Sequence, residues 1–273
     1  MRRPGAGAAD TPPSSDPIST GGRSSAASRK TCAAAPLPPC GRPDGRLRYP
    51  APMPQIAELL ANNQRWADAQ RARDPEFFKR LSSQQAPQFL WIGCADSRVP
   101  ANEIVGLPPG EVFVHRNVAN VVAHGDLNCL STIQFAVDVL KVRHILVVGH
   151  YGCGGVQAVL EQRRLGLVDN WLRHVGDVLL KHRARIDEVE LDSLRHARLC
   201  ELNVIEQAGN VCMTTAVQDA WARGQTLAVH AWIYSLFDGL VRPLDLRVDG
   251  PDGLAAAQQH ALARLTRPLD FAR

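Results

Sequence analysis

The segment WIGCADSRVP (91–100) brings three chemically active side chains together within five positions. An apolar run ends at Cys94, and Asp96 and Arg98 follow directly after it. A thiol, a carboxylate and a guanidinium are rare inside buried strands but common at strand ends, where sites form. The segment therefore predicts a functional site at the end of a buried strand.

A second segment, GHYGCGG (149–155), follows another apolar run and carries His150 and Cys153 on a glycine-rich turn. Two thiolates and one imidazole suit Zn²⁺, and the H-x-x-C spacing lets one short loop supply two ligands. Three protein ligands, with Cys94 as the third, leave one tetrahedral position for water or for the carboxylate of Asp96. A single cysteine or histidine at such a position is usually a structural residue of the core. The combination of Cys94, His150 and Cys153 predicts a metal site.

The elements that must position these side chains are two strands, predicted at 88–94 and 144–150. The second has no polar alternation, as expected for a strand covered on both faces of a parallel sheet. The carboxyl ends of neighbouring parallel strands meet at one edge of the sheet, so the two segments converge if the strands are neighbours. Further strands are predicted at 111–119 and 226–236, and helices at 54–73, 127–141, 253–265 and through most of 171–223.

Strands alternating with helices predict an α/β fold: a mostly parallel central sheet flanked by helices, with an N-terminal helical arm. Residues 51–273 form the single predicted domain, and residues 1–50 a disordered low-complexity tail poor in large apolar residues. An organelle transit peptide remains an alternative for the tail. The internal Met53 before the first helix favours a simple extension of the chain.

Charge and cysteine usage narrow the class of protein. The net charge is +4, but residues 1–50 hold eight Lys or Arg and three Asp, so the remainder is near neutral. No nucleic-acid partner is expected, and no apolar run approaches the ~18 residues of a membrane span. Seven dispersed cysteines without a secretory leader argue against a disulfide framework and for a cytoplasmic protein. Cys129, Cys200 and Cys212 are predicted core residues, whereas Cys32 and Cys40 lie in the tail.

Three stretches resemble the β-class carbonic anhydrases: CADSRVP (94–100), HRNVAN (115–120) and GHYGCGGV (149–156). The resemblance extends over about residues 55–245. It implies one Zn²⁺ per subunit on Cys94, His150 and Cys153, and reversible hydration of carbon dioxide to bicarbonate and a proton by zinc-bound hydroxide. It also implies that Asp96 pairs with Arg98 in the active enzyme.

The resemblance implies further sites and partners. Gln85 matches a glutamine that binds substrate in the family, although Gln84 beside it leaves the match open. Trp91, Arg116 and Tyr234 match a non-catalytic bicarbonate site found in a subset of the family. The chain is expected to form a homodimer or homotetramer that builds its active sites at the subunit interface.

These residues also predict a switch. Arg98 holds Asp96 in a position where it orients the nucleophile; once released, Asp96 takes the open zinc position and blocks it. Bicarbonate near Arg116 would favour the blocked state, and by linkage the blocked state would bind bicarbonate more tightly. Because hydroxide competes with Asp96 for zinc, activity should rise with pH through the weakly alkaline range.

Other readings of the site remain open from the sequence. The same scaffold would serve another linear substrate such as carbon disulfide, or a non-catalytic zinc module with Asp96 as a permanent ligand. Arg98 argues against the zinc module because it offers Asp96 another partner. A thiol redox protein lacks its C-x-x-C motif here, and the glycines of GHYGCGG match neither phosphate-loop pattern.

Overall fold

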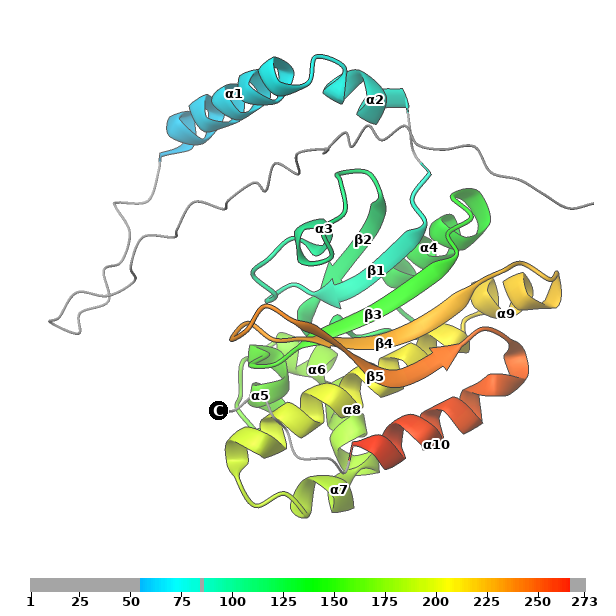
Figure 1. Cartoon of the computed structure of the whole chain (residues 1–273). Coiled ribbons are helices and arrows are strands. Elements are labelled where there is room, and N and C mark those ends of the chain that lie inside the picture. Colours follow the sequence, from blue (N-terminus) through cyan, green and yellow to red (C-terminus); the bar gives the residue numbers. More distant parts are fainter. Residues whose placement is uncertain (1–54, 84–85, 266–273) are drawn as a thin grey trace, which may run out of the picture. The chain divides into compact units, whose positions relative to one another are not determined.

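The structure is a computed structural model that describes residues 55–83 and 86–265 (Figure 1). By its internal contacts the chain divides into residues 1–57 and 58–273. The fold below is that of the second unit, to which α1 contributes all but its first two residues. The predicted tail, 1–50, lies outside the described residues, and so does Gln85.

A five-stranded sheet with the order β2-β1-β3-β4-β5 forms the centre of this unit. Its first four strands are parallel and β5 runs antiparallel to β4. The predicted mostly parallel α/β sheet is therefore confirmed, with β1 and β3 as neighbours. The strands are β1 (Phe89–Cys94), β2 (Val112–Asn117), β3 (His144–His150), β4 (Ala228–Tyr234) and β5 (Val241–Val248).

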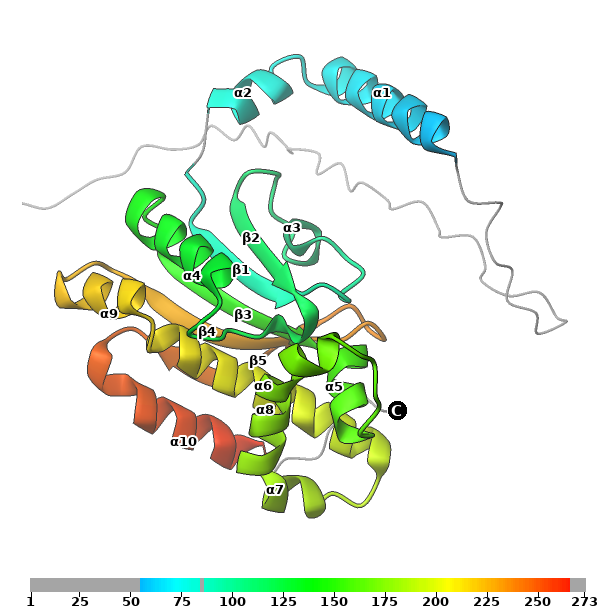
Figure 2. The ribbon, with the colours of Figure 1, turned by 180° about the vertical axis from the view of Figure 1, so that it is seen from behind.

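Helices α4, α8, α9 and α10 pack on one face of the sheet, as the view from behind shows (Figure 2). The main apolar core lies between this layer and the strands. The other face carries a smaller apolar cluster that includes Ala101 of α3. The helices are α1 (Ile56–Arg73), α2 (Phe77–Ser83), α3 (Ala101–Ile104), α4 (Leu127–Gln134), α5 (Gly154–Leu160), α6 (Val168–Lys181), α7 (Arg183–Asp187), α8 (Asp192–Cys212), α9 (Thr215–Ala222) and α10 (Leu254–Arg264).

The close approach of α8 to β3 depends on Gly149. A Cβ atom on Gly149 would lie 2.4 Å from Cγ2 of Val204, so no larger residue fits without moving the helix. All residues of β3 after His144 are buried, as a parallel strand with both faces covered requires. This contact fixes α8 beneath the end of the strand that carries His150.

The helix predicted at 127–141 is split in the structure. It begins as α4, with Asp126 accepting a hydrogen bond from the Asn128 amide, and continues as a π-helical turn, Phe135–Val139. Lys141, with φ of 56°, ends it in the left-handed region and turns the chain into β3. None of the described helices combines the length and the apolar character that crossing a bilayer demands.

Candidate metal centre

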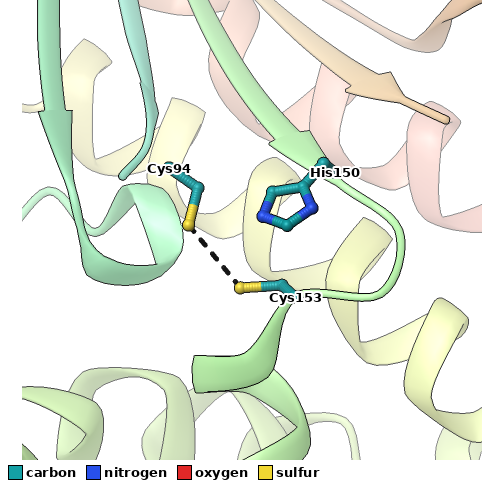
Figure 3. A group of neighbouring side chains, drawn as sticks. All are labelled: Cys94, His150 and Cys153. Atoms are coloured by element: carbon teal, nitrogen blue, oxygen red, sulfur yellow. Dashed lines mark hydrogen bonds between the residues drawn. The ribbon is translucent and has the colours of Figure 1, made fainter. Parts of the chain in front are cut away.

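Cys94, His150 and Cys153 meet at the carboxyl edge of the sheet (Figure 3). Cys94 is the last residue of β1 and His150 the last of the neighbouring β3, while Cys153 immediately precedes α5. Their ligand atoms all lie within 4.8 Å of one another, and all three residues are buried. The convergence expected from the order of the strands is thus present.

The spacing of the two sulfurs fits a shared zinc ion. The Sγ atoms of Cys94 and Cys153 are 3.7 Å apart. Two thiolates, each about 2.3 Å from a tetrahedral zinc, would be separated by about 3.8 Å. The donor set, two sulfurs and one imidazole nitrogen, is also one that zinc prefers.

The hydrogen bonds of His150 leave one ring nitrogen available to a metal. Its Nδ1 lies 3.0 Å from the backbone oxygen of Tyr151, to which it donates when that nitrogen carries the proton. Its Nε2 is buried and makes no hydrogen bond within the described residues. A buried ring nitrogen without a hydrogen bond destabilises the fold unless it binds a ligand, so Nε2 of His150 is suited to bind a metal ion.

The surroundings of Cys94 favour a thiolate. The backbone N–H groups of Ala119 and Asp96 point to its sulfur, at 3.2 and 3.4 Å. A hydrogen bond from the Cys153 thiol lowers the pKa of Cys94 to about 4. The same hydrogen bond and burial raise the pKa of Cys153. The environment of Cys94 thus favours the thiolate that metal binding requires, and a cation between the sulfurs would favour deprotonation of Cys153 as well.

Asp96 lies beside these three residues and is paired with Arg98. Its Oδ1 is 3.6 Å from a guanidinium nitrogen of Arg98, and its Oδ2 accepts the Gly154 amide hydrogen at 3.2 Å. The same Oδ2 is 4.0 Å from Nε2 of His150. The carboxylate therefore lies beside the three possible ligands while it contacts Arg98 and the Gly154 amide.

Of the three residues matched to a bicarbonate site, two are buried aromatic residues and the third binds backbone oxygens of a loop. Trp91 and Tyr234 are buried in the smaller apolar cluster. The guanidinium of Arg116 donates to the backbone oxygens of Cys94, at 2.9 Å, of Ser97 and of Val99. Arg116 thus holds the loop that carries Asp96 and Arg98.

Several residues around the site were not anticipated from the sequence. Tyr151 donates a hydrogen bond to Glu201 of α8, and His196 of the same helix contacts the backbone oxygen of Cys153. The available signal was the acidic residue Glu201 within the mostly apolar segment 199–205. The predicted core cysteines, Cys129, Cys200 and Cys212, are indeed buried.

A second group, His115, Asp126 and Cys129, also brings possible metal ligands together. Its members are already engaged in the fold. Asp126 caps α4, His115 contacts the Asn117 amide at 3.3 Å, and burial raises the pKa of Cys129 to about 12. Because Asp126 and His115 already serve contacts within the fold, we assign this group a structural role.

Comparison with known proteins agrees with the fold and identifies the family. A family model described as carbonic anhydrase matches residues 89–241. The chain belongs to the β-class carbonic anhydrase family. The chain is 48% identical over 202 residues to a carbonic anhydrase of Emericella nidulans, covering 74% of this chain and 88% of the relative.

Other relatives extend this similarity. A carbonic anhydrase of Saccharomyces cerevisiae is 31% identical over 195 residues, covering 68% of this chain and 87% of the relative. The structure of a Coccomyxa β-carbonic anhydrase in complex with acetazolamide superposes with a TM-score of 0.70 at 39% identity, covering 79% of this chain and all of that one. A tetrameric β-carbonic anhydrase of Sordaria macrospora gives 0.67 at 36% identity, covering 71% and 98%.

Proposed function

We propose that this enzyme hydrates carbon dioxide reversibly to bicarbonate and a proton, using one zinc ion held by Cys94, His150 and Cys153. The observation that carries the proposal is the convergence of these three buried residues, with sulfurs 3.7 Å apart and a histidine nitrogen that makes no hydrogen bond to any described residue. Zinc bound there would supply Lewis acidity that activates water at near-neutral pH, an effect for which carbonic anhydrase is itself the standard example.

The chain's own groups then have distinct roles. Asp96 accepts a hydrogen bond from the attacking water and turns its lone pair toward carbon dioxide. Arg98 and the Gly154 amide hold the carboxylate in that orientation. The peptide hydrogens of Ala119 and Asp96 at Cys94 offset part of the charge that two thiolates bring to the ion. Asp96 is therefore the proposed catalytic residue, and Arg98 positions it.

Stopped-flow measurement of carbon dioxide hydration, on protein of known zinc content, tests the proposal. The expected result is one zinc per chain and rapid hydration. Cys153→Ser should lose both, whereas Cys212→Ser, a buried thiol outside the site, should keep both. Wild-type protein that holds zinc but hydrates only another linear substrate, such as carbon disulfide, would refute this assignment.

We further propose that Asp96 also acts as a switch under the control of bicarbonate. Support comes from Arg116, whose guanidinium holds the backbone of the loop that carries Asp96 and Arg98. An anion that attracts Arg116 weakens these hydrogen bonds and loosens the loop. Asp96, already 4.0 Å from Nε2 of His150, then turns from Arg98 to the open metal position.

The switch predicts that activity rises steeply between about pH 7 and about pH 9 and that added bicarbonate shifts the rise upward. Trp91→Phe should weaken inhibition by bicarbonate while sparing the fold better than alanine in this buried position. Trp171→Phe, on α6, serves as the control. A flat pH profile, or bicarbonate inhibition equal in wild type and Trp91→Phe, would count against the switch.

The proposed assembly is a homodimer or homotetramer. A related enzyme from Sordaria macrospora is described as tetrameric. In this chain α1 buries none of its residues, and its apolar side chains Ile56, Leu59, Leu60 and Trp66 are all exposed. An apolar stripe of this kind is typical of a surface that a second subunit covers.

A further inference from the structure

Two of the three metal ligands depend on one short loop. His150 and Cys153 are separated only by Tyr151 and Gly152, and Gly152 takes φ of 73°, which favours glycine. The main chain of Tyr151 is fixed on both sides: its amide donates to the oxygen of Tyr234 at 3.0 Å, and its oxygen contacts Nδ1 of His150 at 3.0 Å. The position of Tyr151 therefore determines how the imidazole of His150 is held.

The side chain of Tyr151 is anchored in α8. Its hydroxyl donates to Oε1 of Glu201 at 2.8 Å, and both residues are 4% exposed. Arg198, one turn earlier on the same helix and 8% exposed, places its Nε 3.5 Å from Oε2 of Glu201. The buried pair of Arg198 and Glu201 on α8 thus holds the hydroxyl of Tyr151, the residue that follows His150.

A stabilising role alone accounts poorly for this arrangement. Burying a carboxylate and a guanidinium costs desolvation energy that their attraction often fails to recover, and apolar replacements are often neutral or better for stability. The same helix touches the loop at a second point, where His196 Nε2 lies 3.0 Å from the backbone oxygen of Cys153. Polar contacts from one helix therefore converge on the loop between the two ligands.

We propose that Glu201, acting through Tyr151, is a positioning residue for the metal centre: it fixes the carbonyl that holds His150 with Nε2 directed at the metal. The inference rests on the proposed zinc site and adds a group that touches no ligand directly. Partners that orient a ligating histidine typically contribute about 10- to 100-fold to metal affinity. Because Glu201 acts one residue further away, an effect of about tenfold is expected.

The test measures the rate at which the zinc-loaded enzyme releases zinc to a chromophoric chelator. Tyr151→Phe removes only the hydroxyl, and Glu201→Leu removes the acceptor; each should release zinc about tenfold faster than wild type. Glu201→Gln keeps an oxygen for the hydroxyl and should stay near the wild-type rate. Because the two residues act as one unit, the Tyr151→Phe/Glu201→Leu double variant should release zinc no faster than either single variant.

Glu206→Gln is the matched control, because Glu206 lies on the same helix but pairs with Lys181 and His182 instead. Its zinc release should equal that of wild type even if its stability falls. Folded Tyr151→Phe that releases zinc at the wild-type rate would overturn the inference, as would equal acceleration by Glu206→Gln. If Glu201→Leu does not fold, Tyr151→Phe and Glu201→Gln still decide the question. Wild-type protein without zinc or hydratase activity would instead refute the proposed function.

Discussion

The Glu201 carboxyl has a pKa raised to about 7, chiefly because burial penalises its charged form. Arg198 and the Tyr151 hydroxyl act in the opposite direction but do not cancel this effect. Between the ordinary value of 4.5 and about 7, the folded chain keeps a proton that the unfolded chain has lost. This group therefore destabilises the fold progressively as pH rises through that window, and fully above it.

Glu201→Gln should remove this cost. Relative to wild type, the free energy of unfolding of the variant should increase as pH rises from about 4.5 to about 7. Denaturant titrations at several pH values measure the difference. Glu206→Gln should behave oppositely. Burial raises the pKa of Glu206, but hydrogen bonds from His182 and Lys181 outweigh burial, and the pKa is lowered overall. Glu206→Gln should therefore be less stable than wild type above pH 4.5, and this difference should disappear as pH falls below that value. Parallel pH curves for Glu201→Gln and wild type would contradict the prediction.

The convergence of Cys94, His150 and Cys153 was predictable from the sequence, because thiol and imidazole side chains are unusual at strand ends and zinc accepts few sets of ligands. Arg116 and Glu201 were not predictable in their structural roles. Arg116 contacts three backbone oxygens, and a backbone oxygen leaves no trace in residue identity. Glu201 meets Tyr151 across 50 positions of the chain, a contact that local spacing does not encode.

At the scale of elements, the packing of α8 on β3 through Gly149 yields a direct prediction. Gly149→Ala should destabilise the fold by about 1–3 kcal/mol, because its Cβ would overlap Val204. Gly176→Ala in α6 is the matched control: apart from its chain neighbours and the backbone of its own helix, no described atom lies within 4 Å of its Cβ position, and alanine is favoured over glycine in a helix by about 0.5–1 kcal/mol. Chemical denaturation compares the two. A Gly149→Ala variant as stable as wild type would mean that the two elements are less closely fixed than described.

The success of the element predictions varied with the strength of the local pattern. The strand at 144–150 is confirmed at both ends, because a fully apolar run between charged and glycine residues has clear limits. The helix at 127–141 was predicted as one piece, since periodicity does not distinguish an α-helix from a π turn near its end. The antiparallel direction of β5 follows from its pairing with β4, and the local sequence pattern does not predict that pairing.

For the whole molecule, the exposed apolar side of α1 predicts dependence of assembly on that helix. Leu59→Lys should shift the protein toward smaller species, because a charge would enter the surface that we propose a partner subunit covers. Ala61→Lys adds the same charge on another side of the helix and should leave the assembly unchanged. Analytical ultracentrifugation at several concentrations measures both. Assembly unaffected by Leu59→Lys would place the contact between subunits elsewhere.

The order of the strands has a consequence for how the protein matures. β1 pairs on both sides with strands made after it, and Cys94 meets Cys153 only when 59 further residues have been synthesised. Helix α8, which supports the loop between the ligands, comes later still. A growing chain on the ribosome therefore has all three ligands only once Cys153 is made, a little past the middle of the chain, and the helix that supports their loop only at Cys212, after about three quarters of it. Metal uptake should accordingly report the end of folding rather than its beginning, and nascent chains stalled before α8 should fail to retain the ion.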